Sequence, residues 1–226
     1  MARSSSKQNL DGQMSSSNAG GDKTADDQVL DDSATVRGHI VSAGSQTGEE
    51  VGQGLYDMGF TTHAADGSQL SVSSLRGKVS LFVNVASQCG YTKTNYEALQ
   101  RIYDRYHSYG LEIWAFPCND FGSQEPWNES EIVSFVRNTF KVSFTVTSKI
   151  AAINSHPIFA WLRAHSPPTD AFPVGADINW NFNKFLVDKN GHVVKRYPSS
   201  IDEAAIMADV YQQLVQNDSQ QQVADS

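Results

Sequence analysis

The sequence predicts an α/β domain in which helices flank a central mixed β-sheet, with an extra β-hairpin on its N-terminal side. Two apolar, β-branched runs, Val79–Val85 and Leu111–Pro117, are typical of strands buried on both faces. Between them, apolar residues recur at three- and four-residue steps, as on an amphipathic helix. A strand, a helix and a second strand in this order form a right-handed parallel unit, which defines the fold class.

The two ends of the chain differ in composition from its middle. Residues 1–53 are rich in Ser, Gly, Asp and Gln and nearly lack aromatic side chains. Such a segment buries too little apolar surface to offset its chain entropy, so we expect a disordered tail, with a targeting or docking tail as the alternative. We expect one folded domain over 54–216 and a second disordered tail, polar in composition, over 217–226.

Local signals place the other elements. A hairpin is expected around the turn residues Asp66 and Gly67. The first long helix is expected to stop at Gly110, and Asn128 is expected to cap the next one. The remaining predicted elements are a short strand at 144–146, a helix at 156–164, a strand from 178 to 187, its antiparallel partner at 192–197 and a closing helix from 202 to about 215. The order βαβ, α, ββα is that of a thioredoxin-like fold.

Charge and cysteine content exclude several classes of function. A net charge of -8 disfavours a general binder of nucleic acid or of anionic membranes. Two cysteines without a Cys-X-X-Cys pair indicate neither a disulfide framework nor a zinc site, and they are typical of a reducing compartment. There is no apolar run of about 18 residues, no signal peptide and no acid-poor transit segment. We therefore expect a cytoplasmic protein without integral membrane association.

Cys89 lies between the carboxyl end of the first buried strand and the start of a helix. This position is the ligand-binding edge of an open α/β sheet. The positive end of the helix dipole there favours a thiolate over a thiol. The alternative is that Cys89 is a small buried side chain, as many free cysteines are. A reactive thiol is thus a hypothesis that depends on finding suitable partners.

Three neutral hydrogen-bond donors come from other parts of the chain, namely Gln124 in the loop after the second strand and the neighbours Trp180 and Asn181. A thiolate that attacks a peroxide needs donors that hold the anion and assist the departing alkoxide. Amide and indole N–H groups do this without burying a second charge. Each residue also has an ordinary explanation, as a solvated amide, a core tryptophan and a capping or turn asparagine.

Three sequence blocks resemble the signature motifs of the glutathione peroxidase family. They are NVASQCGYT, FPCNDFGSQEPW and WNFNKFLVDKNGHVVKRY, which occur in the family's order, and the similarity covers residues 55–214. The resemblance implies a thioredoxin-like fold. It also implies that Cys89 is the peroxidatic cysteine, with Gln124, Trp180 and Asn181 as its catalytic partners.

The reaction follows from the same resemblance. Cys89 thiolate would attack the O–O bond of hydrogen peroxide or of an organic or lipid hydroperoxide, becoming a sulfenic acid and releasing water or an alcohol. One thiol would then condense with the sulfenic acid, and a second thiol would reduce the mixed disulfide. The resemblance implies an antioxidant oxidoreductase without a cofactor, whose co-substrate is glutathione or another thiol.

The chain departs from the family pattern at the resolving cysteine. Many cysteine-containing members carry a second cysteine in the helix after the QEP motif, where this chain has Arg137. The other thiol, Cys118, matches a cysteine that is normally structural. We therefore expect glutathione as the reductant. The alternatives are a thioredoxin-dependent peroxidase that resolves through Cys118, and a peroxide sensor or thiol relay that passes its oxidation to a partner protein.

Cations in and near the three blocks are candidate contacts for the carboxylates of glutathione. They are Lys93, Lys184, Lys195 and Arg196, and a solvated rim of positive charge is the alternative. Asp120 stands where the family usually has glutamine, and it either faces the thiol or points to solvent.

Two further expectations come from comparison with the family pattern. The long loop that supports tetramers in some members is missing between positions 166 and 178. The chain therefore resembles the monomeric type that acts on phospholipid hydroperoxides. A selenocysteine at position 89 that had been replaced by cysteine would give the same sequence.

Overall fold

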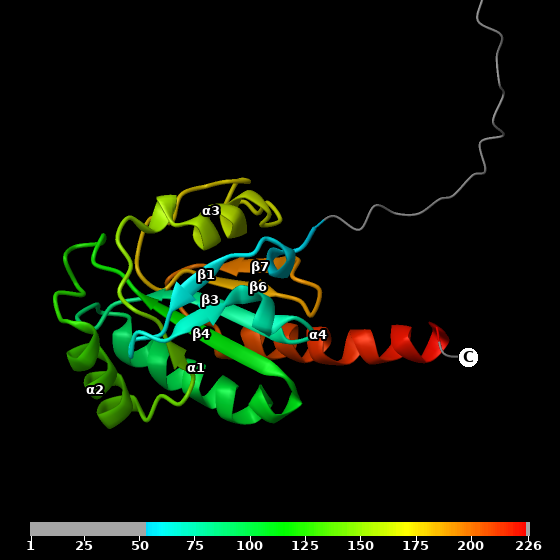
Figure 1. Ribbon diagram of the computed structural model, residues 1–226, viewed down its shortest axis with the longest axis horizontal. Coiled ribbons are helices and arrows are strands. Elements are labelled where there is room, and N and C mark those ends of the chain that lie inside the picture. The colour runs from blue at the N-terminus through cyan, green and yellow to red at the C-terminus, as the bar shows by residue number, and fades with distance from the viewer. Residues whose placement is uncertain (1–52, 225–226) are drawn as a thin grey trace, which may run out of the picture. The chain divides into compact units, whose positions relative to one another are not determined.

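The structure is a computed structural model that describes the backbone of residues 53–224 and the side chains of residues 53–216. The predicted tail 1–53 lies outside the described residues except for Gln53. Within the described part, five strands form a mixed sheet in the order β5-β4-β3-β6-β7. They are β3 (Val79–Val85), β4 (Leu111–Pro117), β5 (Thr145–Val146), β6 (Lys184–Val187) and β7 (Val193–Tyr197). Figure 1 shows this sheet between two layers of helices.

Strand β3 lies at the centre of the sheet, and all seven of its residues are buried. It pairs in parallel with β4 on one side and antiparallel with β6 on the other. Side chains alternate across the sheet, so Leu81 and Val83 join one apolar cluster while Phe82 joins another on the opposite face. The near-continuous apolar run in the sequence is the signature of this two-sided burial.

The predicted hairpin forms a separate two-stranded antiparallel sheet of β1 (Thr61–His63) and β2 (Gln69–Ser71). Its turn contains Gly67 at a φ of +86°, a left-handed conformation that favours glycine. Asp66 Oδ1 accepts a hydrogen bond of 2.9 Å from the backbone N–H of Ser68, which closes the turn. The hairpin and the mixed sheet together give the predicted thioredoxin-like fold.

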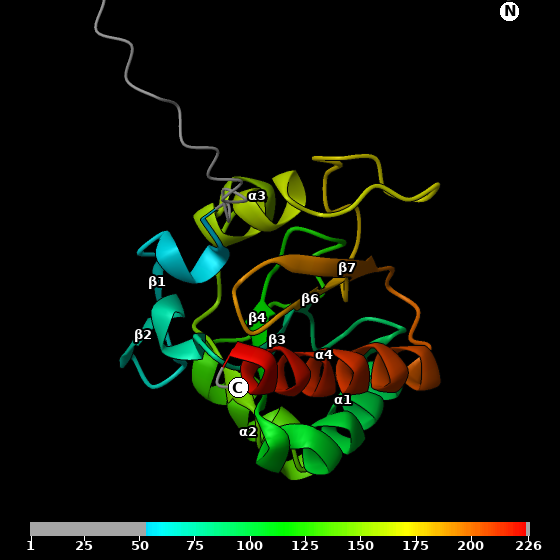
Figure 2. The same ribbon diagram turned by 90° about the vertical axis from the view of Figure 1, so that its right-hand side faces the viewer.

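Three helices cover one face of the sheet, and a fourth covers the other, as the view in Figure 2 shows. The first group is α1 (Thr92–Tyr106), α2 (Glu129–Phe140) and α4 (Glu203–Ala224), and the fourth helix is α3 (Pro157–Ala164). The predicted capping box opens α2, where Asn128 Oδ1 accepts from the backbone N–H of Glu131 at 3.0 Å. The predicted stop after α1 is Gly110, which has a φ of +101°.

Two predicted boundaries are wrong. Strand β6 begins at Lys184, whereas residues 178–182 form a loop in which Phe182 has a left-handed φ of +63°. The apolar pattern predicted a strand, but hydrogen bonds with Asn84 hold this loop in a different conformation. Helix α4 continues to Ala224, past the predicted end near Val215. Because no glycine or proline interrupts this stretch, nothing in the sequence stops the helix where the polar tail begins.

Candidate active site

Cys89 lies at the carboxyl end of β3, immediately before α1. Its side chain is 8% exposed, and Sγ accepts a hydrogen bond of 3.5 Å from the backbone N–H of Tyr91. The backbone of Cys89 is fixed as well, because its N–H donates to Thr92 Oγ1 at 3.1 Å. That hydroxyl donates in turn to the carbonyl oxygen of Ala86 at 2.6 Å. The thiol is therefore held at a helix N-terminus, the position expected from the sequence.

Gln124 and Asn181 meet at this edge of the sheet although they lie far apart in the chain. Asn181 Nδ2 donates to Gln124 Oε1 at 2.9 Å. The backbone N–H of Gln88, the neighbour of Cys89, donates to the carbonyl oxygen of Gln124 at 2.9 Å. Asn181 is completely buried and Gln124 is half-buried, while Trp180 is 39% exposed and so is not a core tryptophan. The structure thus connects the loop that carries Gln124 and the loop that carries Trp180 and Asn181 to the thiol loop.

Backbone strain flanks both amide side chains. Ser123, directly before Gln124, has a φ of +52°, and Phe182, directly after Asn181, has a φ of +63°. Residues other than glycine adopt this region rarely, and such conformations persist only where the surrounding structure imposes them. Two independent loops are strained where they deliver a candidate catalytic side chain, and this supports a functional requirement for their conformation.

Asn84 is a positioning residue that the sequence argument missed. It is completely buried in β3, and its Nδ2 donates to the carbonyl oxygen of Trp180 at 3.1 Å. Its Oδ1 accepts from the backbone N–H of Asn183 at 2.9 Å, and its own carbonyl oxygen accepts from Phe182 N–H at 2.7 Å. A polar side chain in the middle of a buried apolar strand is the signal that could have found it, because buried amides are hydrogen-bonded to something specific.

Two of the four candidate glutathione contacts are structural cations. Lys184 is completely buried, and its Nζ donates at 2.9–3.2 Å to three carbonyl oxygens, those of Pro198, Ser199 and Ser200. The Arg196 guanidinium is also buried, and it donates to the carbonyl oxygens of Ala176 and Asp177 and to Asn183 Oδ1. Both groups therefore hold loops together inside the domain, and their assignment as glutathione contacts stays a prediction.

The other two candidates lie at the surface. Lys93 is exposed in the first turn of α1, four residues after Cys89. Lys195 is exposed on β7, where its Nζ forms an ion pair of 2.8 Å with Asp209. Of the two, Lys93 is the one that the chain places beside the thiol.

Replacement of Lys184 by methionine is expected to destabilise the domain by about 2–4 kcal/mol, since the hydrogen bonds from its buried ammonium group to three carbonyl oxygens are lost. Burial lowers the pKa of Lys184, whereas those carbonyl oxygens favour its charged form. Urea unfolding would measure the loss, and Lys195→Met, which removes an exposed charge, serves as the matched control with a change within about 0.5 kcal/mol. An unchanged unfolding midpoint in Lys184→Met, with a raised KM for glutathione, would support Lys184 as a reductant contact.

Comparison with known proteins is consistent with this geometry. The family model described as glutathione peroxidase matches residues 55–163. A hydroperoxy fatty acid reductase of Synechocystis sp. is 45% identical over 157 residues, which are 67% of this chain and 92% of that protein. The chain belongs to the glutathione peroxidase family. It is therefore a peroxidase that reduces hydroperoxides with a thiol.

Further relatives resemble this glutathione peroxidase in sequence or in structure. A chloroplastic phospholipid hydroperoxide glutathione peroxidase of Arabidopsis thaliana is 42% identical over 153 residues, which are 67% of this chain and 63% of that protein. Among solved structures, the crystal structure of T. cruzi GPX1 is 32% identical, with a TM-score of 0.57. That match covers 71% of this chain and 96% of the T. cruzi chain.

The second thiol of this glutathione peroxidase is far less accessible than the first. Cys118 follows β4, is completely buried, and belongs to the apolar cluster under α3, on the opposite face of the sheet from the cluster that contains Cys89. Burial is the main cause that raises the pKa of Cys118 to about 12, with a smaller contribution from the charge of Asp120. An un-ionised thiol is a poor nucleophile, so the structure gives Cys118 the environment of a core residue.

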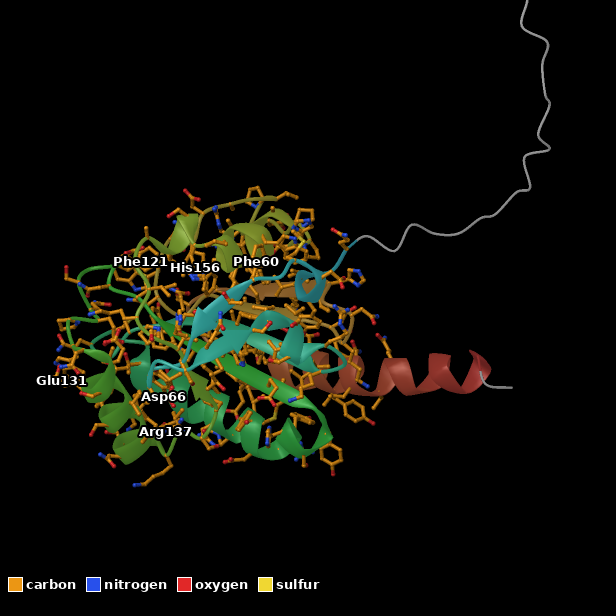
Figure 3. The ribbon with its side chains drawn as sticks, viewed as in Figure 1. Phe60, Asp66, Phe121, Glu131, Arg137 and His156 are labelled. Carbon is orange, nitrogen blue, oxygen red and sulfur yellow. The ribbon has the colours of Figure 1, made fainter. Side chains whose placement is uncertain are left out.

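Asp120 and Arg137, the two departures from the family pattern, both have structural partners. Asp120 Oδ2 accepts a hydrogen bond of 2.7 Å from the backbone N–H of Ile153. The two alternatives considered for this carboxylate, that it faces the thiol or that it points to solvent, both leave out this bond. The Arg137 guanidinium donates to the carbonyl oxygens of Val142 and Phe144 just beyond α2. Figure 3 shows Arg137 on α2, well separated from Phe121 in the loop that carries Gln124.

Neither a cluster of possible metal ligands nor a membrane-spanning helix is found in the part of the peroxidase that the structure describes. Within residues 53–216, no group of three or more His, Cys, Asp and Glu side chains is arranged to hold a metal ion. None of the described helices combines the length and the apolar character that crossing a bilayer requires.

Proposed function

We propose that Cys89 is the peroxidatic residue and that Gln124, Trp180 and Asn181 stabilise its thiolate and the departing oxygen. The observation that carries the proposal is the contact between Asn181 Nδ2 and Gln124 Oε1, joined to the thiol loop by the bond from Gln88 N–H. Neutral donors from two loops are thereby linked to the loop that carries the Cys89 sulfur, just before a helix N-terminus. Preorganised donors of this kind stabilise negative charge as it moves in a transition state.

The first half of the reaction oxidises Cys89. Its thiolate attacks one oxygen of the hydroperoxide, a sulfur–oxygen bond forms, and the O–O bond breaks. The electron pair of that bond goes to the departing oxygen, which takes up the proton that the thiol gave up and leaves as water or an alcohol. Sulfur is oxidised to sulfenic acid and the hydroperoxide is reduced. Donors on Gln124, Trp180 and Asn181 would hold the developing oxyanion during this step.

The second half restores the thiol. A first glutathione thiolate attacks the sulfenic sulfur of Cys89, and water leaves as the mixed disulfide forms. A second glutathione attacks that disulfide, which releases glutathione disulfide and the Cys89 thiolate. Direct reduction by glutathione is favoured over a thioredoxin-like reductant because Cys118 lies on the other face of the sheet and Arg137 occupies the position of the resolving cysteine. Lys93 is the proposed contact for a glutathione carboxylate.

Bulky hydroperoxides, including those of lipids, are the proposed substrates alongside hydrogen peroxide. Tyr91 is 42% exposed and Trp180 is 39% exposed, so the thiol loop and the loop that carries Asn181 each present an aromatic side chain at the surface, which suits an acyl chain. The relatives named for hydroperoxy fatty acids and phospholipid hydroperoxides support this assignment. We place this enzyme in the cytoplasm, because both of its cysteines are free thiols and its cycle draws on a reducing thiol pool. The monomeric state is proposed because the loop that supports tetramers in some family members is missing between positions 166 and 178.

A steady-state assay that crosses two reductants with two substrates tests the proposal. The enzyme would be supplied with glutathione or with thioredoxin and its reductase, each with hydrogen peroxide and with a fatty acid hydroperoxide. We expect turnover with glutathione for both substrates. Turnover confined to thioredoxin would reject the proposed reductant, and no turnover with either would reject the proposed chemistry.

Mass analysis of the peroxide-treated enzyme addresses the resolving step separately. With one equivalent of peroxide and no added thiol, we expect a gain of one oxygen on the peptide that contains Cys89. With glutathione present, that peptide is expected to carry glutathione. A Cys89–Cys118 disulfide would contradict the structural role of Cys118 and favour the thioredoxin-dependent cycle.

A further inference from the structure

Glu125, the neighbour of Gln124, carries a buried carboxyl group that the proposed reaction does not use. The side chain is completely buried. Its Oε2 accepts a hydrogen bond of 3.1 Å from the Ser87 hydroxyl, whereas Oε1 has no hydrogen-bond partner among the described residues. Buried polar atoms are almost always hydrogen-bonded, so an orphaned carboxyl oxygen beside an active site points to a functional reason for its retention.

The groups that face this carboxyl come from several elements. Ser87 lies in the loop after β3, and Tyr96 on α1 is completely buried, with a hydroxyl that also lacks a partner among the described residues. Lys149 is the nearest cation, but its Nζ donates to backbone carbonyl oxygens, that of Trp127 at 2.8 Å and that of Glu125 at 3.5 Å. The carboxyl is therefore not neutralised by a direct ion pair.

The pKa of Glu125 lies in the neutral range because the carboxyl group is buried. Burial raises its pKa to about 7, because a charge in an apolar interior loses the solvation that it has in water. Hydrogen bonds from Ser87 and the more distant charge of Lys149 oppose this effect and lower the pKa. The fully buried Tyr96 hydroxyl adds a polar but uncharged neighbour.

A short path connects Glu125 to the sulfur. Ser87 precedes Cys89 by two residues, and the intervening Gln88 donates its backbone N–H to the carbonyl oxygen of Gln124. The segment 124–125 thus holds the segment 87–88 at two consecutive positions, once through backbone and once through the carboxyl. Whatever changes the strength of the Ser87–Glu125 bond also changes how firmly the thiol loop is held.

We propose that Glu125 is a positioning residue that holds the Cys89 loop through Ser87, so that its charge state controls the rate at which Cys89 is oxidised. This inference rests on the proposed role of Cys89. The ionised carboxylate accepts charge-assisted hydrogen bonds from Ser87, which are about twice as strong as neutral ones. The protonated carboxyl is uncharged and accepts weaker hydrogen bonds from Ser87. The Cys89 loop is therefore held more firmly above about pH 7, where Glu125 is ionised, than below it.

The test is the pH dependence of Cys89 oxidation by hydrogen peroxide, followed by stopped-flow tryptophan fluorescence from pH 5.5 to pH 9. The Glu125→Gln variant keeps the volume of the side chain but cannot ionise. Wild type is expected to show a transition near pH 7 that the variant lacks. At pH 8 the variant is expected to react more slowly, on the order of tenfold, the kinetic equivalent of one charge-assisted hydrogen bond.

Two further variants separate positioning from a merely structural effect. Glu131→Gln removes a nearby exposed carboxylate, visible at the edge of the domain in Figure 3, and should keep the transition near pH 7. Ser87→Ala keeps the carboxyl but removes its link to the loop, so the transition should shrink. If Cys89 is oxidised in wild type but Glu125→Gln keeps the same transition near pH 7, the inference about Glu125 is overturned and the proposed function is not. If Cys89 is not oxidised in wild type, the proposed function itself is overturned.

A direct titration avoids dependence on a variant that folds poorly. In wild type labelled with ¹³C at glutamate carboxyl carbons, one resonance is expected to titrate with a midpoint near 7. Thermal unfolding of Glu125→Gln checks that the variant remains folded during the kinetic experiments. If every glutamate carboxyl of wild type titrates below pH 5.5, the inference is rejected whatever the kinetics of the variants.

Discussion

Cys89→Ser is expected to lose peroxide turnover by a factor on the order of 10³ or more, because a serine hydroxyl is not ionised at neutral pH and cannot form a sulfenic acid. The substitution is nearly isosteric, and among residues 53–216 Sγ accepts a single, long hydrogen bond, from Tyr91 N–H at 3.5 Å. The fold should therefore be unaffected. Consumption of peroxide in the coupled glutathione assay, with circular dichroism to confirm folding, measures the effect.

Cys118→Ala is the matched control for this prediction. Cys118 is completely buried on the other face of the sheet, so its loss should reduce stability slightly and leave the oxidation rate of Cys89 unchanged. Wild-type turnover in Cys89→Ser would remove this thiol from the chemistry. A collapse of turnover in a folded Cys118→Ala variant would instead assign the second thiol a catalytic role.

Gln124→Ala, Asn181→Ala and Trp180→Phe are each expected to slow Cys89 oxidation, by a factor on the order of 10² for the strongest of them, as is typical when one donor is removed from an anion-stabilising site. The Gln124 and Asn181 effects should not add, because the two side chains are hydrogen-bonded to each other at 2.9 Å. A double-mutant cycle of single-turnover oxidation rates measures this coupling directly.

Gln212→Ala provides the control for these donor variants, since Gln212 is an exposed amide on α4, remote from the thiol loop. Its oxidation rate should equal that of wild type. Thermal unfolding distinguishes a loss of donors from a loss of structure in the site variants. Unchanged oxidation rates in all three variants, with intact folds, would contradict the proposed stabilisation of the thiolate and the leaving oxygen.

Most of the fold was predictable because its signals are local. The runs that form β3 and β4 are apolar on both faces, the capping box of Asn128 and Glu131 lies within four residues, and Gly110 marks the end of a helical pattern. Each depends on neighbours in sequence. The positions of Cys89, Gln124 and Asn181 followed from loops at one edge of the sheet together with the resemblance to the family.

The features that escaped prediction depend on contacts between distant segments. Residues 178–182 have the composition of a strand, but the amide of Asn84, nearly a hundred positions earlier, holds them as a loop. Lys184 has the appearance of a surface cation until its three carbonyl acceptors are seen. The orphaned carboxyl of Glu125 is likewise invisible in the motif QEP, because burial is a property of the folded domain.

With Cys89 as the proposed peroxidatic residue, the placement of the two sulfurs on opposite faces of the sheet predicts what happens when peroxide arrives faster than the reducing thiol. An oxidised Cys89 has no internal thiol to shield it, so its lifetime depends on how soon an external one arrives. During that interval a second peroxide molecule converts the sulfenic acid to a sulfinic acid, which glutathione does not reverse. Susceptibility to hyperoxidation is thus built into the architecture, and the inactivated fraction would record past oxidant exposure.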